Sequence, residues 1–156
     1  MSRIGVIRLR GTIGMKKDVK DTLKMLRLNS KNQCIVIKNN PANVGMIKKA
    51  KDYITWGEIN EKTFMELLKQ RGRIVGKKKL TEEYIKEKLN ISVDQFIKEF
   101  FDLKRELKHI PGIKLSFRLK PPVGGFERKG IKIPFSLGGA IGYRKDKIND
   151  LILKML

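Results

Sequence analysis

The sequence predicts an α+β fold, in which a small β-α-β-α-β core with a three-stranded sheet is followed by a mainly helical C-terminal extension and a basic loop. Over residues 1–59, short apolar runs alternate with segments of helical spacing. Over residues 60–156, amphipathic helical patterns dominate, and glycine and basic residues gather between 113 and 143. We therefore expect a core at 1–59 and an extension at 60–156 that packs on it.

The core begins with a strand, a helix and a second strand. The run Ile4–Arg10 is rich in β-branched residues, which favour an extended chain. Val19, Leu23 and Leu26 then recur with the spacing of one buried helical stripe. The wholly apolar run Cys34–Ile37 is typical of a strand buried on both faces. This order predicts a right-handed crossover that joins two parallel strands.

A second helix and a third strand complete the predicted core. The turn before Pro41 is typical of a helix start, and Met46, Ala50 and Tyr53 keep helical spacing. The β-forming run Tyr53–Trp56 then precedes a glycine, and we expect the third strand there.

The extension carries clear helix boundaries. Gly72 is a favoured residue at a helix C-terminus, and Thr81 is a favoured N-cap. Ser92 fits a capping box with Gln95, and the pair Pro111-Gly112 stops the helix that follows. We expect helices over 61–71, 81–89 and 92–108.

A glycine-rich basic loop is predicted over 113–143. Leu115, Phe117 and Leu119 alternate with polar residues, so a short strand enters the loop before two prolines. The remainder lacks periodicity and has the single acid Glu127, which is typical of an RNA-facing arm that orders fully on its partner. The alternative is a solvated loop. A final helix over 144–156 carries an apolar stripe that should dock on the body.

The charge of the chain indicates the class of its partner. It has 156 residues, and 36 Lys and Arg against 16 Asp and Glu give a net charge of +20. Such self-repulsion weakens an isolated fold, so a polyanion is the economical partner, and nucleic acid is the commonest. Membrane surfaces and acidic proteins are the alternatives. The sequence has no apolar run near the ~20 residues of a spanning helix and no secretory leader, so we expect a cytoplasmic chain without a membrane partner.

Residues for enzyme chemistry are scarce. Metal sites need several His, Cys or carboxylate ligands at set spacing, and the chain has one histidine, His109, and one cysteine, Cys34. Cys34 lies in an apolar run and is interpreted as a buried hydrophobe. The glycines at 72–76 and 138–142 match neither a P-loop nor a dinucleotide fingerprint. We expect no metal, no cofactor and no small-molecule substrate.

Aromatic residues are also few, at 7% of the chain, and no strand carries the interleaved aromatic pattern that stacks bases. Charge without exposed aromatics favours readout of the backbone and shape of folded RNA. The basic residues expected to contact RNA are Arg8, Arg10, Lys16, Lys17, Arg27, Lys48, Lys49, Arg73, Arg118, Lys120, Arg128, Lys129, Lys132 and Arg144. For each, the alternative is an ordinary solvated surface charge.

Several blocks of the sequence resemble a known family, the universal large-subunit ribosomal proteins numbered thirty, whose eukaryotic counterparts are numbered seven. These blocks are 10–12, 17–28, 41–46, 51–60, 69–73, 79–81, 115–122, 124–125, 138–139 and 146–149. The extension beyond residue 60 and the short N-terminus resemble the archaeal type. The segment 127–135 matches the family poorly.

The resemblance implies a core similar to the ferredoxin-like fold with its first strand central. It also implies a structural constituent of the large ribosomal subunit that binds 23S rRNA near 5S rRNA and contacts other large-subunit proteins. No enzymatic activity and no cofactor come with it. A free-standing RNA chaperone or ribosome assembly factor is the alternative function. An RNA-modifying or cleaving enzyme is a third, and it lacks a visible acid-base or metal pair.

Overall fold

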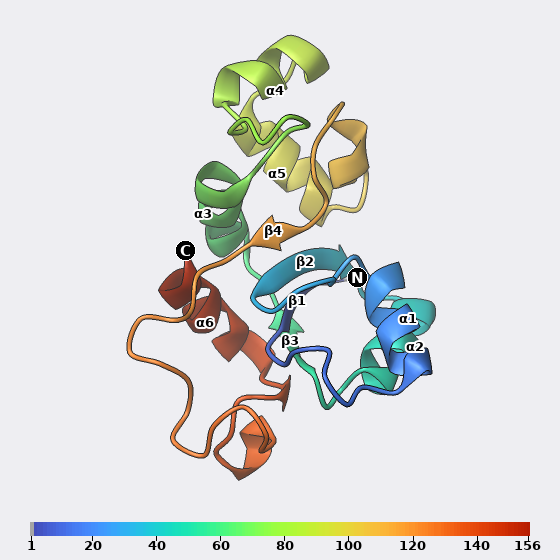
Figure 1. Ribbon diagram of the computed structural model, residues 1–156. Coiled ribbons are helices and arrows are strands. Elements are labelled where there is room, and N and C mark those ends of the chain that lie inside the picture. The colour runs from blue at the N-terminus through green and yellow to red at the C-terminus, as the bar shows by residue number, and fades with distance from the viewer. Residues whose placement is uncertain (1) are drawn as a thin grey trace.

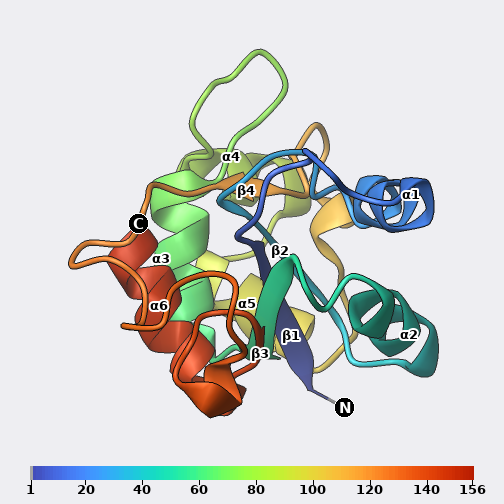
Figure 2. The ribbon, with the colours of Figure 1, turned by 60° about the horizontal axis from the view of Figure 1, so that its bottom comes forward.

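The computed structural model describes residues 2–156 and shows a sheet covered by helices on both faces (Figures 1 and 2). The strands are β1 (Arg3–Arg8), β2 (Gln33–Lys38), β3 (Ile54–Glu58), β4 (Phe117–Arg118) and β5 (Gly142–Tyr143). The helices are α1 (Lys17–Met25), α2 (Pro41–Lys49), α3 (Glu61–Arg71), α4 (Glu82–Leu89), α5 (Val93–Phe101) and α6 (Ile148–Met155). The predicted α+β class is confirmed.

The sheet has the order β4-β2-β1-β3-β5, so the first strand is central, as the resemblance implies. It has five strands, because two short edge strands from the basic loop extend the predicted three. Both β2 and β3 run antiparallel to β1, with Ile7 opposite Cys34 and Val6 opposite Trp56. The predicted parallel pairing of the first two strands is therefore wrong.

The reason for the antiparallel pairing lies in the segment after α1. That segment brings the chain back to the end of the sheet where β1 finishes. There the Asn32 N–H donates to the Arg8 carbonyl at 2.7 Å, and the Arg8 guanidinium donates to the Leu28 carbonyl at 2.8 Å. The handedness rule applies to parallel strands, and the element order alone does not fix strand direction.

The two faces of the sheet bury two separate hydrophobic clusters. On one face, Ile4, Val6 and Ile35 pack with the buried residues of α1 and α2. On the other, Ile7 and Cys34 pack with α3, α5 and α6. Figure 2 shows α1 and α2 to one side of the sheet and α3 and α6 to the other. The extension therefore supplies the second layer that the core needs.

Side-chain caps start four of the six helices of residues 2–156. Asn40, Asn60, Thr81 and Ser92 each accept a hydrogen bond from the backbone N–H three residues later. Each cap satisfies one of the N–H groups that a helix start leaves without a partner. The predicted starts at Pro41, Thr81 and Ser92 are confirmed.

The predicted helix over 92–108 is too long. Helix α5 ends at Phe101, Leu103 adopts the left-handed conformation with φ of 64°, and a separate 3-10 turn covers Leu107–His109. The reversal allows the Arg3 guanidinium to reach the end of α5, where it donates to the Phe100 carbonyl at 2.7 and 2.9 Å. A cation is favourable at that end of a helix, where carbonyls lack partners within the helix.

The basic loop is tied to the sheet at both ends. Strand β4 pairs with β2, and β5 runs parallel to β3. Phe117 of the predicted strand is buried, and so are Ala140 and Ile141, so part of the segment expected to be an RNA-facing arm contributes to the core. The final helix is shorter than predicted, because a 3-10 turn at Lys145–Lys147 precedes α6.

Arg3 joins the first strand to the extension, and we predict that its replacement weakens the whole fold. The side chain also donates to the Arg105 carbonyl at 2.9 Å and lies 3.8 Å over the Phe100 ring. Arg3→Leu leaves these carbonyls without a donor, so we expect a loss of about 2–4 kcal/mol in the free energy of unfolding. Urea unfolding measures it, with the exposed Arg128→Leu as a control that should unfold like the parent. Equal midpoints for Arg3→Leu and the parent would contradict this role.

Candidate nucleic-acid interface

The structure separates the fourteen basic residues expected to contact RNA by their exposure. Arg8 and Arg144 are buried, at 3% exposure each, and Arg10 and Arg73 are half-buried. The other ten are exposed: Lys16, Lys17, Arg27, Lys48, Lys49, Arg118, Lys120, Arg128, Lys129 and Lys132. Exposure leaves these ten free to meet phosphates.

Arg8 holds the end of β1 in place. Its guanidinium donates to the carbonyls of Arg10 and Leu28 and to the Thr12 hydroxyl, at 2.8–3.2 Å. Burial lowers the pKa of Arg8 from its ordinary value. The expectation that this side chain contacts RNA is corrected here, because its donors are turned inward and are used by the protein itself.

Arg144 binds the basic loop to the sheet through its side chain. It pairs with both carboxylate oxygens of Glu127 at 2.6 and 3.2 Å and donates to the Ala140 carbonyl and the Thr55 hydroxyl. The Phe135 ring lies 4.6 Å from the guanidinium. The expectation that Arg144 contacts RNA is corrected in the same way, since the arginine and the one acid of the loop satisfy each other.

One end of the sheet gathers seven exposed cations and the half-buried Arg10 from distant parts of the sequence. Strand β1 ends there, β2 and β3 begin there, and Arg118 of β4 lies opposite Gln33. We call this the basic end of the sheet, and it comprises Arg10, Lys16, Lys17, Lys31, Lys48, Lys49, Lys51 and Arg118. Lys31 and Lys51 are additions to the predicted set, because only the strand register shows that their turns lie here.

A second group of cations lies on the loop 73–79. Arg73 pairs with Lys79 in a short bridge, and Ile74 pairs with Ile113. Figure 2 shows this loop projecting from the body near α4. Lys77, Lys78 and Lys79 are exposed on it. The loop therefore holds its ammonium groups away from the core, and the two bridges fix its ends to the body of the protein.

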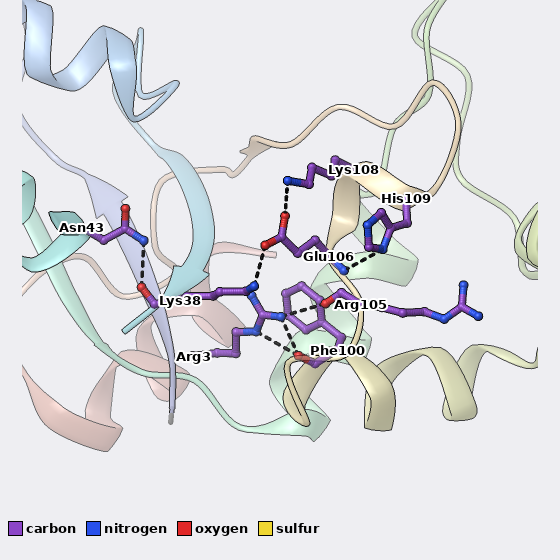
Figure 3. Close-up of polar contacts among 8 residues, drawn as sticks. All are labelled: Arg3, Lys38, Asn43, Phe100, Arg105, Glu106, Lys108 and His109. Carbon is purple, nitrogen blue, oxygen red and sulfur yellow. Dashed lines mark hydrogen bonds and ion pairs between the residues drawn. The ribbon is translucent and has the colours of Figure 1, made fainter. Parts of the chain in front are cut away.

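A groove crosses the outer edge of β2 between the two helical layers. It has a volume of about 300 Å³ and is lined by parts of α1, β2, α2 and the turn after α5. Figure 3 shows the polar contacts at its wall, where Glu106 lies between Lys38 and Lys108 at 2.7 Å from each ammonium. Hydrogen bonds from Lys108 and Lys38 lower the pKa of Glu106 from 4.5 to about 2. We call this feature the β2 groove.

An exposed aromatic residue lies at the opposite sheet edge. Tyr143 is 46% exposed, and its ring centroid is 6.3 Å from that of Trp56. Its hydroxyl donates to the Glu58 carboxylate at 2.6 Å, and this hydrogen bond raises the Tyr143 pKa to about 12. Sequence reasoning missed this pair, because β5 contains two residues and has no detectable periodicity.

The described residues hold no cluster of three or more histidine, cysteine or carboxylate side chains that could bind a metal. Cys34 is fully buried, and burial raises its thiol pKa to about 12, in keeping with the predicted apolar role. The His109 Nδ1 accepts a hydrogen bond from the Glu106 N–H. Within residues 2–156, no helix is long and apolar enough to span a bilayer.

Comparison with known proteins gives a consistent result over almost the whole chain. The sequence model of the family described as "Ribosomal protein L30p/L7e" matches residues 4–54. Three proteins named "Large ribosomal subunit protein uL30" are similar. That of Nanoarchaeum equitans is 52% identical over 100% of both chains, and that of Methanococcus vannielii is 49% identical over 97% of both. That of Methanopyrus kandleri is 45% identical over 95% of this chain and 100% of its own.

The lowered pKa of Glu106 predicts a defined pH dependence of stability. The ionised carboxylate is favoured in the folded state, so its contribution is full above pH 4.5 and is lost as the pH falls through about 2. We expect Glu106→Gln to reduce the free energy of unfolding at pH 7 by about 1 kcal/mol, because the side chain is partly exposed. The difference from the parent should shrink as the pH falls toward 2 and vanish below it in urea titrations.

Glu87→Gln is the matched control for this measurement. The Glu87 side chain is 72% exposed, and its nearest ammonium, on Lys88, is 3.7 Å away. This variant should follow the parent at every pH. If the Glu106→Gln curve instead ran parallel to the parent curve from pH 7 to pH 2, the ion pairs in the β2 groove would contribute nothing to stability.

Proposed function

The chain belongs to the ribosomal protein L30p/L7e family and is a structural constituent of the ribosome, and we propose that it binds 23S rRNA of the large subunit through its exposed cations. The observation that carries the proposal is the basic end of the sheet, where eight cations from five separate segments converge. Convergence of like charge costs free energy in the isolated protein, and a polyanion offsets that cost.

The mode of recognition follows from the side chains at the basic end. Lysine and arginine neutralise phosphates and release condensed counterions, which supplies affinity without reading the base sequence. The cations sit on turns and helix ends that a rigid sheet holds in place. We therefore expect the protein to fit the shape of a folded rRNA junction, with its register fixed by the spacing of the phosphates.

The family membership also supports finer proposals about partners. We propose that the chain lies near 5S rRNA and touches other large-subunit proteins in the cytoplasm. The relatives are named as ribosomal proteins, and the chain is not an enzyme. The exposed apolar residues Val123 and Leu153, at 79% and 50% exposure, are candidates for contacts with a neighbouring protein.

A free-standing RNA chaperone or assembly factor remains the rival function, and sedimentation distinguishes the two. We expect an epitope-tagged chain, expressed in an archaeal host, to sediment with mature large subunits on a sucrose gradient. A chaperone would instead leave a substantial pool at the top of the gradient, and an assembly factor would appear only with precursor particles. Either distribution would overturn the proposed structural role.

The phosphate contacts predict a measurable salt dependence. Binding to transcribed 23S rRNA should weaken steeply with salt, and Arg118→Ala should reduce the slope of log K against log salt by about 0.7–0.9, the share of one phosphate. Filter binding at several salt concentrations measures it. Lys104→Ala is the control, because this lysine is 73% exposed and lies outside the predicted set. A flat salt dependence of the parent would contradict the mechanism.

A further inference from the structure

Strand β2 carries an unpaired backbone edge inside the β2 groove. Its pairing with β4 covers Gln33 and Cys34, and no strand lies opposite the residues that follow. The Leu119 N–H donates to the Asn32 carbonyl at 2.9 Å, whereas on the other edge the Asn39 N–H donates to the Ser2 carbonyl at 3.1 Å. Backbone groups alternate between the edges of an antiparallel strand. Even-numbered residues of β2 therefore point away from β1.

Val36 is the next even-numbered residue of β2, and no strand in the described part of the chain lies opposite its backbone on the groove side. Its N–H and C=O lie on the groove side, where the pairing with β4 stops at Cys34, and neither group takes part in the backbone hydrogen bonds that residues 2–156 make outside their helices and strands. The residue itself is only 7% exposed. Buried backbone groups in native proteins almost always have partners, so an adjacent donor and acceptor facing an open groove mark a place for a ligand.

The walls of the β2 groove indicate what kind of ligand fits. Met25, Met46 and Leu115 line it, and methionine side chains adapt well to flat rings. Four cations, on Arg3, Arg27, Lys38 and Lys108, line the groove with the single carboxylate of Glu106, which pairs with both lysines. The volume of about 300 Å³ is at the lower end for ligand pockets, and it suits one planar ring system.

From this geometry we propose that the β2 groove binds one unstacked adenine base of RNA, an inference that rests on the proposed RNA-binding function. The Val36 N–H and C=O match a base edge that carries an acceptor beside a donor, as adenine does with N7 and the N6 amino group. On this Hoogsteen edge, guanine presents two acceptors, N7 and O6, and would leave the Val36 carbonyl unpaired. Guanine carries an acceptor beside a donor only on its Watson–Crick edge, whereas adenine does so on both edges. The methionines cover the ring, and the cations meet the flanking phosphates.

An added peptide strand fits this edge less well. Strand addition needs a row of free backbone groups. Here the Lys38 carbonyl already accepts from the Asn43 side chain at 2.9 Å and from the Asn40 N–H at 3.0 Å. A peptide strand could therefore bond only to the Val36 N–H and C=O and to the Lys38 N–H. The excess of cations at the lining also favours a phosphate-bearing ligand over a peptide of ordinary charge.

Amide chemical shifts of the full chain test the proposal. We expect adenosine 5′-monophosphate to shift the Val36 and Lys38 amides, with an apparent affinity at least ~5-fold higher than that of guanosine 5′-monophosphate. Ribose 5-phosphate has the same anionic group without a base and should leave Val36 unmoved. Equal shifts with ribose 5-phosphate would show an anion site only and would overturn the proposal. So would a Val36 shift with the acetylated tripeptide Asp-Val-Asp and not with the nucleotide, which would indicate strand addition.

A pair of matched variants separates the groove from general effects of charge. Met25→Glu places a carboxylate at the lining of the groove on a side chain that is 73% exposed, and it should weaken adenosine monophosphate binding several-fold. Leu153→Glu makes the same kind of change on a side chain of α6 that is 50% exposed, and it should leave this binding unchanged. Equal effects of the two variants would overturn the proposal.

The same samples distinguish a failure of this inference from a failure of the proposed function. If the groove holds no base, the Val36 amide stays unmoved while the parent still binds 23S rRNA with a steep salt dependence. If the proposed function is wrong, that salt-dependent binding is itself absent. The two outcomes are read from different measurements.

Discussion

Strand β1 has helices packed on both sides of it, and the rest of the architecture depends on this two-sided burial. Val6 faces α1 and α2, while Ile7 faces α3, α5 and α6, and both are fully buried. A strand with no solvent face needs two covering layers, so the extension is a required part of the fold. The basic end of the sheet exists because both neighbouring strands run antiparallel to β1 and begin where it finishes.

Burial of arginine is the second physical feature that shapes this molecule. The interior guanidiniums of Arg3 and Arg8 bond mainly to backbone carbonyls, and Arg144 alone has a carboxylate partner. Burial lowers the pKa of Arg3 and Arg8, but arginine stays protonated at neutral pH. Backbone carbonyls satisfy the N–H donors of Arg3 and Arg8 but do not neutralise their positive charge, so both residues add to the positive potential of the protein. At the same time, the Arg3 side chain holds β1 to the extension.

Local patterns in the sequence predict the presence of the helices and the caps at Thr81 and Ser92, because those features depend on residues close in sequence, but they miss the end of α5 and the start of α6. Strand direction was not predictable, since it follows from two contacts between residues far apart in sequence: the Asn32 N–H donates to the Arg8 carbonyl, and the Arg8 guanidinium donates to the Leu28 carbonyl. The same limit applies to the site. The alternation of side chains along a strand places Arg8 and Arg10 on one face, but Arg8 is buried because the segment after α1 folds back over it and accepts its hydrogen bond. The open edge at Val36 depends on where β4 stops, and no residue pattern records that.

The stability of the fold depends on whether its positive charges are neutralised, and the proposed rRNA partner would neutralise them. Exposed cations at the basic end and on the loop 73–79 repel one another across distances that salt screens only in part. A ligand that binds only the folded state adds to stability as its concentration rises above its dissociation constant. Under the proposed function, phosphates that bridge these cations stabilise the fold as they bind, and the hydrogen bonds of Arg3 and Arg144 hold the proposed binding surfaces in position in the free protein. On this proposal, the positive charge that destabilises the isolated chain stabilises both the protein and the rRNA once they are bound.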